Sequence, residues 1–112
     1  MLVKHAASVE PQQLREGVGI RWLLASPDGA PNFAMRLIEL QPGIVFEPHA
    51  HPFEHEIYVL EGAGMVTTPA GDSGVMEPGV SLLIMPDEPH GYRNTGDTAL
   101  KFICVIPLQQ KH

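Results

Sequence analysis

The amino-acid sequence predicts an all-β fold, a sandwich or barrel of short strands. Eleven glycines and eleven prolines are spread along the 112 residues, so turns interrupt the chain often. The runs between these turns have the length of strands, and β-branched or aromatic residues recur in most of them. The turns recur about every eight to twelve residues, which is typical of sandwiches and barrels. No segment keeps a helical period between good caps over about 12 residues.

Each expected strand is an apolar or alternating run bounded by turn signals. In chain order the strands are GIRWLLA (19–25), NFAMRLIEL (32–40), EIYVLEG (56–62), AGMVTTP (63–69), VSLLIM (80–85), HGYRN (90–94) and ALKFICVI (99–106). The turn signals are SPDGAP (26–31), QPG (41–43), EG (61–62), PAGD (69–72), EPG (77–79), PDEP (86–89) and NTGD (94–97). We expect Trp22, Met35 and Met65 in the core. The length predicts a single domain over residues 1–112, with the barrel core at approximately residues 19–107.

The last expected strand is apolar at both parities. Alternation along it gives two sets, Phe102, Cys104 and Ile106 on one face and Ile103 and Val105 on the other. We therefore expect both faces to be covered, one by the core and the other by a second sheet or subunit. The strand at 32–40 is similarly apolar on both sides. Because a short chain has a modest core, these faces predict a homodimer.

Composition and charge exclude several classes of partner. The formal net charge is −6, and the seven Lys and Arg residues are spread singly, so we expect neither nucleic acid nor an anionic membrane as partner. No segment approaches the roughly 20 apolar residues of a membrane span. The N-terminal segment lacks the apolar run of a signal peptide. Cys104 is the only cysteine, which excludes an intrachain disulfide and a thiolate metal cluster. We expect a cytoplasmic protein that binds a small molecule.

Histidines are concentrated in one short stretch, HAHPFEH at residues 49–55. Residues two apart in a strand point to the same side, so His49 and His51 can bind one ion together. A hairpin turn at residues 52–54 is expected to bring His55 across from both. Burying several titratable rings without a shared partner is costly, and a metal ion removes this cost because neutral imidazole is a natural ligand. The spacing therefore favours a metal site over a chance cluster.

Two stretches resemble the two motifs of the cupin family. GIVFEPHAHPFEHEIYVLEG at residues 43–62 resembles the first motif, G(X)5HXH(X)3–4E(X)6G. GVSLLIMPDEPHGYRN at residues 79–94 resembles the second, G(X)5PXG(X)2H(X)3N, and follows in the correct order. The resemblance implies a double-stranded β-helix, a conical barrel of jelly-roll type, with a metal ion inside it. The ligands it implies are His49, His51, His55 and His90.

The sequence departs from these motifs at two positions. His55 has the motif spacing from Gly62 but stands where most cupins carry glutamate, and the longer permitted spacing would select Glu56 instead. Spacing and strand parity both favour His55. The resulting set is similar to that of small bacterial cupins with the run HxHPWEHE. In the second motif Glu88 replaces glycine, which leaves the turn before His90 open.

The resemblance also implies the chemistry of the site. Four neutral imidazoles would leave a divalent ion its full charge, so it would be a stronger Lewis acid than with a carboxylate ligand. Imidazole suits Fe, Ni, Cu and Zn, and cupin precedent favours Mn or Fe. Phe102, Cys104 and Ile106 fall where small cupins line the substrate pocket, although ordinary core packing would explain them too. Arg36 is expected to point inward toward a substrate carboxylate or a glutamate, or to keep its head in solvent at the barrel mouth.

Analogy with cupin dioxygenases predicts a metal-dependent oxidoreductase that acts on a small organic molecule. The first alternative is a non-catalytic binding or sensing protein, which the lack of an evident general acid or base favours. The second is a redox-neutral isomerase or decarboxylase in which the ion stabilises an enolate. Cupins host all of these functions, so the fold alone does not choose between them.

Overall fold

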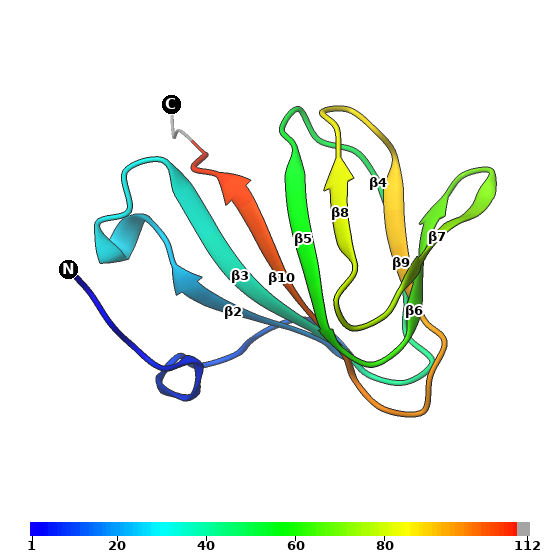
Figure 1. Cartoon of the computed structure of the whole chain (residues 1–112), viewed down its shortest axis with the longest axis horizontal. Coiled ribbons are helices and arrows are strands. Elements are labelled where there is room, and N and C mark those ends of the chain that lie inside the picture. Colours follow the sequence, from blue (N-terminus) through cyan, green and yellow to red (C-terminus); the bar gives the residue numbers. More distant parts are fainter. Residues whose placement is uncertain (110–112) are drawn as a thin grey trace.

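The structure is a computed structural model that describes residues 1–109. Nearly all of its regular elements are strands, as Figure 1 shows. Their bounds are η1 (Ala6–Ser8), β1 (Gln12–Arg15), β2 (Val18–Leu24), η2 (Ser26–Asp28), β3 (Phe33–Leu40), β4 (Val45–His49), β5 (His55–Glu61), β6 (Gly64–Thr68), β7 (Gly71–Met76), β8 (Ser81–Ile84), β9 (His90–Asn94) and β10 (Leu100–Pro107). Within residues 1–109 no helix has the length and apolar character needed to cross a membrane.

The strands form two antiparallel sheets that enclose the core between them (Figure 1). The six-stranded sheet has the order β1-β2-β3-β10-β5-β8, and the four-stranded sheet has the order β4-β9-β6-β7. Neighbours in each sheet are mostly distant in sequence, as in β10, which pairs with both β3 and β5. This arrangement confirms the predicted all-β fold of jelly-roll type.

All the expected strands are present, and the structure adds β1, β4 and β7 to them. β7 has the sequence GDSGVM, whose turn-forming residues conceal a strand that pairs with β6 in a hairpin. β4 lies inside the first histidine stretch and pairs with β9. These three strands lie at or beside sheet edges, where tertiary pairing outweighs weak local propensity.

The core consists of the alternate side chains that face inward from both sheets. The inward set of β10 is almost inaccessible, with Phe102 and Cys104 at 0% and Ile106 at 5% exposure, so its predicted parity is confirmed. Trp22 and Met35, expected in the core, are instead 38% and 36% exposed. Met35 points outward because its neighbours on β3 point inward, and Trp22 lies toward the end of β2, where its ring lines a groove with Ile106 and Leu108.

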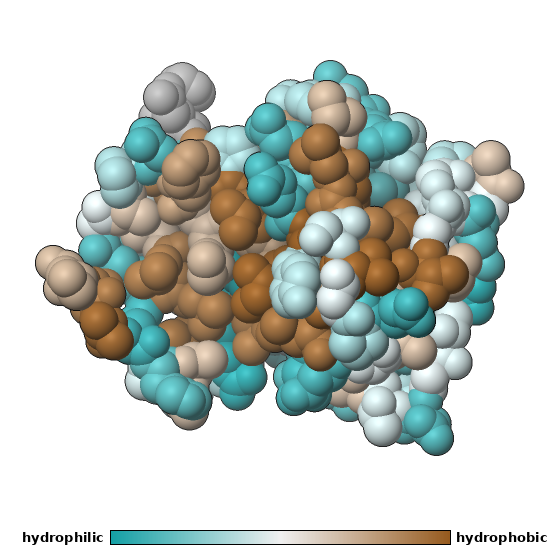
Figure 2. All heavy atoms as spheres, in the orientation of Figure 1, coloured by the Kyte–Doolittle hydropathy of each residue, from teal (hydrophilic) through white to brown (hydrophobic). Residues whose placement is uncertain are grey.

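The outer face of the six-stranded sheet is apolar, as the alternate residues Ile103 and Val105 of β10 indicated. Ile103 and Val105 are half-buried there and line a hollow of about 530 Å³ with Tyr58 and Leu83. Figure 2 shows hydrophobic residues gathered on this side of the molecule. The second sheet packs on the opposite face and leaves this surface uncovered.

Candidate metal centre

The histidines of the two stretches meet at one end of the barrel. His49 is the last residue of β4, and His90 is the first of β9, directly opposite it in the register of that strand pair. His51 follows in the connection after β4, and not in the strand itself as the pattern predicted. His55 begins β5 in the other sheet. The site is therefore built from both sheets.

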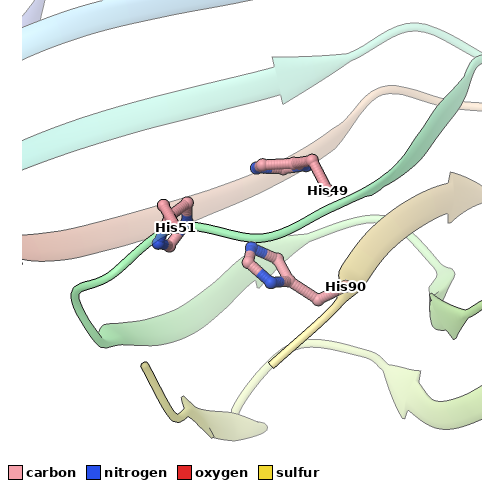
Figure 3. A group of neighbouring side chains, drawn as sticks. All are labelled: His49, His51 and His90. Carbon is pink, nitrogen blue, oxygen red and sulfur yellow. The ribbon is translucent and has the colours of Figure 1, made fainter. Parts of the chain in front are cut away.

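Three of these imidazoles face one another closely. Each of His49, His51 and His90 has a ring nitrogen within 4.8 Å of those of the other two. Figure 3 shows their rings converging from β4, the following connection and β9. The ring centroids of His49 and His90 are 4.5 Å apart, and those of His51 and His90 are 4.9 Å apart. His49 is the most exposed of the cluster, so the open side of the site lies next to it.

His55 lies beside this group and not within it. Its ring stacks on His51 with a centroid distance of 4.2 Å, and its centroid is 5.1 Å from that of His90. Glu56, the alternative from the longer motif spacing, is exposed and lines the hollow on the outer face. The predicted hairpin at residues 52–54 is wrong, because β4 and β5 belong to different sheets and this segment crosses between them.

Hydrogen bonds occupy Nδ1 of two of the rings and fix the orientation of both. Nδ1 of His51 lies 2.8 Å from the carbonyl oxygen of Phe53, and Nδ1 of His90 lies 2.8 Å from that of Glu88. A carbonyl oxygen can only accept, so each Nδ1 carries the proton and each Nε2 keeps its lone pair. The Nε2 atoms of His51, His55 and His90 are buried and find no hydrogen-bond partner among the described residues. Buried, unpartnered lone pairs on neighbouring imidazoles fit a metal cation.

The surroundings favour the neutral form of three of these imidazoles, His49, His55 and His90. Burial lowers the pKa of His49 and His90, and it lowers that of His55 to about 3. The positive guanidinium of Arg36 acts in the same direction on His49 and His55. Neutral imidazole is the form that binds metals, so the site is prepared for a cation without having to release protons near neutral pH.

Acidification is expected to destabilise the metal-free protein as the pH falls from about 6.5 toward about 3. The ordinary pKa of histidine is 6.5, and burial lowers that of folded His55 to about 3, so the unfolded chain binds more protons in this window. The free energy of unfolding is therefore highest above this window and should fall by a few kcal/mol, on the order of one per pKa unit, as protons bind. Urea denaturation across the window measures this loss, and H55Q should reduce it. An H55Q variant with the same pH dependence as the wild type would contradict the assignment.

The buried thiol of Cys104 lies against the ring of His55. Sγ of Cys104 lies 3.1 Å from Nδ1 of His55 and accepts a hydrogen bond from Nη2 of Arg36 at 2.9 Å. Cys104 is fully buried, and burial raises the pKa of its thiol. If Nδ1 of His55 carries the proton, as the carbonyl-bonded rings do, Sγ accepts from it and Nε2 is left free.

The turn before His90 takes a form that the second motif did not predict. Where that motif has glycine, Glu88 accepts a hydrogen bond from the backbone of Met85 through its carboxylate at 3.0 Å. The left-handed conformation falls one residue earlier, on Asp87, with φ at 63°. The backbone N–H of Asp87 then donates to the carbonyl oxygen of His51 at 2.8 Å, which joins the two histidine segments.

Of the four predicted pocket residues, Arg36 and Ile106 each line a separate space, whereas Phe102 and Cys104 line neither of them. Arg36 points inward and lines a cavity of about 50 Å³ with His49, His55 and Phe46. Ile106 lines a larger groove of about 540 Å³, together with Trp22, Ala34 and Leu108. Phe102 packs against the ring of Tyr92 at a centroid distance of 5.0 Å. Cys104 contacts the side chains of Arg36 and His55 through its sulfur.

Tyr92 is the residue of this site that the sequence analysis left out. It is 4% exposed, lines the small cavity, and its hydroxyl has no hydrogen-bond partner among the described residues. Burial raises the pKa of this phenol, so it stays protonated and can donate. Tyr92 lies two residues after His90 on the same strand, so the two side chains share a face, and this spacing could have identified Tyr92 from the sequence.

Comparison with known proteins places these features in a family. The family model described as "Cupin domain" matches residues 36–106. Protein SchB of Streptomyces halstedii is 34% identical over 98 residues, which cover 83% of this chain and 68% of that protein. Polyketide synthase CurC of Streptomyces cyaneus is 32% identical over 112 residues, covering 97% of this chain and 71% of that protein. The structure of the polyketide cyclase RemF from Streptomyces resistomycificus is 30% identical, superposes with a TM-score of 0.90, and covers 100% of this chain and 82% of that one.

Proposed function

This chain belongs to the cupin family, and we propose from this premise that it is a metal-dependent cyclase that closes a ring in a poly-β-ketone. The observation that carries the proposal is the set of buried, unpartnered imidazole nitrogens. The likeness to a polyketide cyclase over the whole chain supplies the substrate class. A cyclase of this kind is a redox-neutral enzyme. The proposal therefore agrees with the second alternative of the sequence analysis, in which the ion stabilises an enolate.

His49, His51, His55 and His90 would hold the ion in this proposal. A bound divalent ion supplies Lewis acidity, which withdraws electron density from a carbonyl oxygen and eases loss of the neighbouring carbon-bound proton. Four uncharged ligands would not neutralise the ion, and His49 is the most exposed of the four rings, so a substrate would approach from its side. Mn or Fe remains our prediction for the metal, with Ni, Cu and Zn also compatible with imidazole.

The proposed reaction is an intramolecular aldol condensation. A carbon between two carbonyl groups loses a proton and bonds to the carbon of a distant ketone, whose oxygen gains a proton. Loss of one water then forms the ring double bond, so neither an oxidant nor a reductant takes part. The role of the chain is to fold the substrate and to exclude water. The larger groove of about 540 Å³, with the apolar residues Trp22, Ala34 and Ile106 in its wall, suits this task.

Oxygen dependence separates this proposal from the dioxygenase that the sequence analysis favoured. The metal-loaded protein is incubated with a linear poly-β-ketone made by a minimal polyketide synthase, with and without air, and products are followed by mass spectrometry. We expect a cyclic product that has lost water, formed at equal rates in both atmospheres. Uptake of oxygen atoms into the product would support the dioxygenase instead. Tight binding of the poly-β-ketone without turnover would support the non-catalytic alternative.

Replacing Cys104 by alanine is expected to weaken metal binding about tenfold, the lower end of losses seen when a group that orients a ligand is removed. The alanine lacks an acceptor for Nδ1 of His55, so this ring would lose its fixed orientation. Cys104→Ser keeps an acceptor and should stay close to the wild type. Metal affinity by competition with a chromogenic chelator measures both variants. Equal weakening by serine and alanine would assign the effect to packing and not to the hydrogen bond.

We propose that the apolar outer face of the six-stranded sheet is the interface of a homodimer. Leu83 is 62% and Tyr58 is 49% exposed at the rim of the hollow on this face. Leu83→Asp places a charge there and should convert the protein to monomers in light scattering coupled to gel filtration. The matched control is Val75→Asp, which changes a residue 56% exposed on β7 of the other sheet. A wild type that is already monomeric would refute this interface.

A further inference from the structure

Two hydrogen-bond donors near the imidazoles have nothing to bond to among residues 1–109. The hydroxyl of Tyr92 is buried without a partner, and so is Nε of Arg36. Both residues line the same small cavity as His49 and His55. A buried donor without an acceptor is destabilising, so such groups in a folded protein commonly meet a ligand or a water molecule.

The charge of Arg36 is also uncompensated. No carboxylate of residues 1–109 lies within 4.0 Å of its guanidinium, although other arginines do form such pairs. Its one side-chain acceptor is the sulfur of Cys104, which is a weak one. A half-buried cation with this environment favours an oxygen that carries negative charge.

Arg36 stands between the two spaces of the site. Its guanidinium carbon lies 5.4 Å from the ring centroid of Trp22, which lines the larger groove. The cavity of about 50 Å³ has room for only a few atoms, whereas the groove of about 540 Å³ can accept rings. A substrate lying in the groove would therefore reach the imidazoles with its polar end, past Arg36.

We propose that Arg36 and Tyr92 form a subsite for one oxygen of an enolised 1,3-dicarbonyl, whose other oxygen faces the imidazoles. This inference rests on the proposed function and names the part of the substrate that the site selects. The guanidinium and the phenol both donate to the first oxygen, which gains negative charge when the carbon between the carbonyls loses its proton. Arg36 and Tyr92 are thus substrate-binding residues and not metal ligands.

Binding of acetylacetone, a small enolisable 1,3-diketone, tests this subsite. Calorimetry compares the affinity for acetylacetone of the metal-loaded wild type, R36Q and Y92F. Azide is the second probe, because this small anion would bind at the metal ion alone and would not use the subsite. We expect each variant to bind acetylacetone about tenfold more weakly, the loss of one hydrogen bond to a charged oxygen, with azide affinity and metal content unchanged. R21Q and Y58F, which change the same residue types on the outer face, should bind both probes as the wild type does.

The outcomes separate this inference from the proposed function. If R36Q and Y92F bind acetylacetone as tightly as the wild type while metal and azide are retained, the subsite is refuted and the metal centre stands. A wild type that holds no metal would refute the proposed function, and the subsite with it. Y92F only removes an unpartnered hydroxyl, so its melting temperature should not fall. Weaker binding by Y92F therefore cannot be assigned to unfolding.

Discussion

Replacing His90 by alanine is expected to lower the affinity for divalent metal by about two orders of magnitude or more, since loss of a mere orienting group already costs 10–100-fold. The ring of His90 lies close to each of the other three, with centroids 4.5 Å from His49, 4.9 Å from His51 and 5.1 Å from His55. The variant would therefore lack a proposed ligand that neighbours all the others. Ring closure in the poly-β-ketone should be lost to the same extent.

Elemental analysis after dialysis against a weak chelator measures the bound metal in this variant. His90 is buried, so His49→Ala provides a second variant at the exposed side of the cluster, where folding is less at risk. The matched control is His5→Ala, an exposed histidine that caps a short helix far from β9 in sequence. Full metal content in both cluster variants would exclude these imidazoles as the ligands.

Alternation and turn chemistry made the architecture predictable. The inward parity of Phe102 and Cys104 follows directly from the period of a strand, and both residues are fully buried. Trp22 shares its inward parity with Ile20 but is 38% exposed, since it lines a groove. Parity predicts the direction of a side chain, whereas its burial depends on what lies opposite.

The sequence predicted that histidines from two distant stretches lie close together, and the structure brings His49, His51 and His90 together. Motif spacing selected His55 over Glu56, and the structure places His55 inside and Glu56 outside. Turn chemistry at Pro52 suggested a hairpin, whereas residues 52–54 cross from one sheet to the other. A local pattern cannot distinguish a hairpin from a crossing between sheets, because each returns the chain toward the same place. Only the pairing of the flanking strands separates the two cases.

Residues that serve the site through tertiary contacts escaped the sequence analysis. Nothing local marks the sulfur of Cys104 as a partner of His55, 49 residues away. The left-handed turn at Asp87 was concealed because the motif requires glycine one position later. Such contacts depend on which strands become neighbours, and this is a property of the whole chain.

The second large effect is expected from Gly91→Ala, which changes the residue directly after His90. β9 lies between β4 and β6, and at Gly91 their backbones approach closely. A Cβ there would lie 2.8 Å from the backbone nitrogen of Pro48 and 2.7 Å from Oγ1 of Thr67, and would also contact the carbonyl oxygen of Phe46. Backbone atoms cannot move aside without breaking strand pairing, so we expect a loss of about 3 kcal/mol in the free energy of unfolding.

The same clash should reach the metal centre. The register of β4 and β9 shifts between Phe46 and His49, which places the crowded atoms next to the pair formed by His49 and His90. Moving β4 away from Gly91 would therefore separate two proposed ligands, and metal affinity should fall together with stability. Urea denaturation and chelator competition measure the two losses. The control is Gly74→Ala in β7, where a Cβ meets nothing within 4 Å. If Gly91→Ala has the same free energy of unfolding as Gly74→Ala, the sheet can adjust at this position and the clash is refuted. The positions of His49 and His90 would then depend on the histidine hydrogen bonds and not on close strand packing.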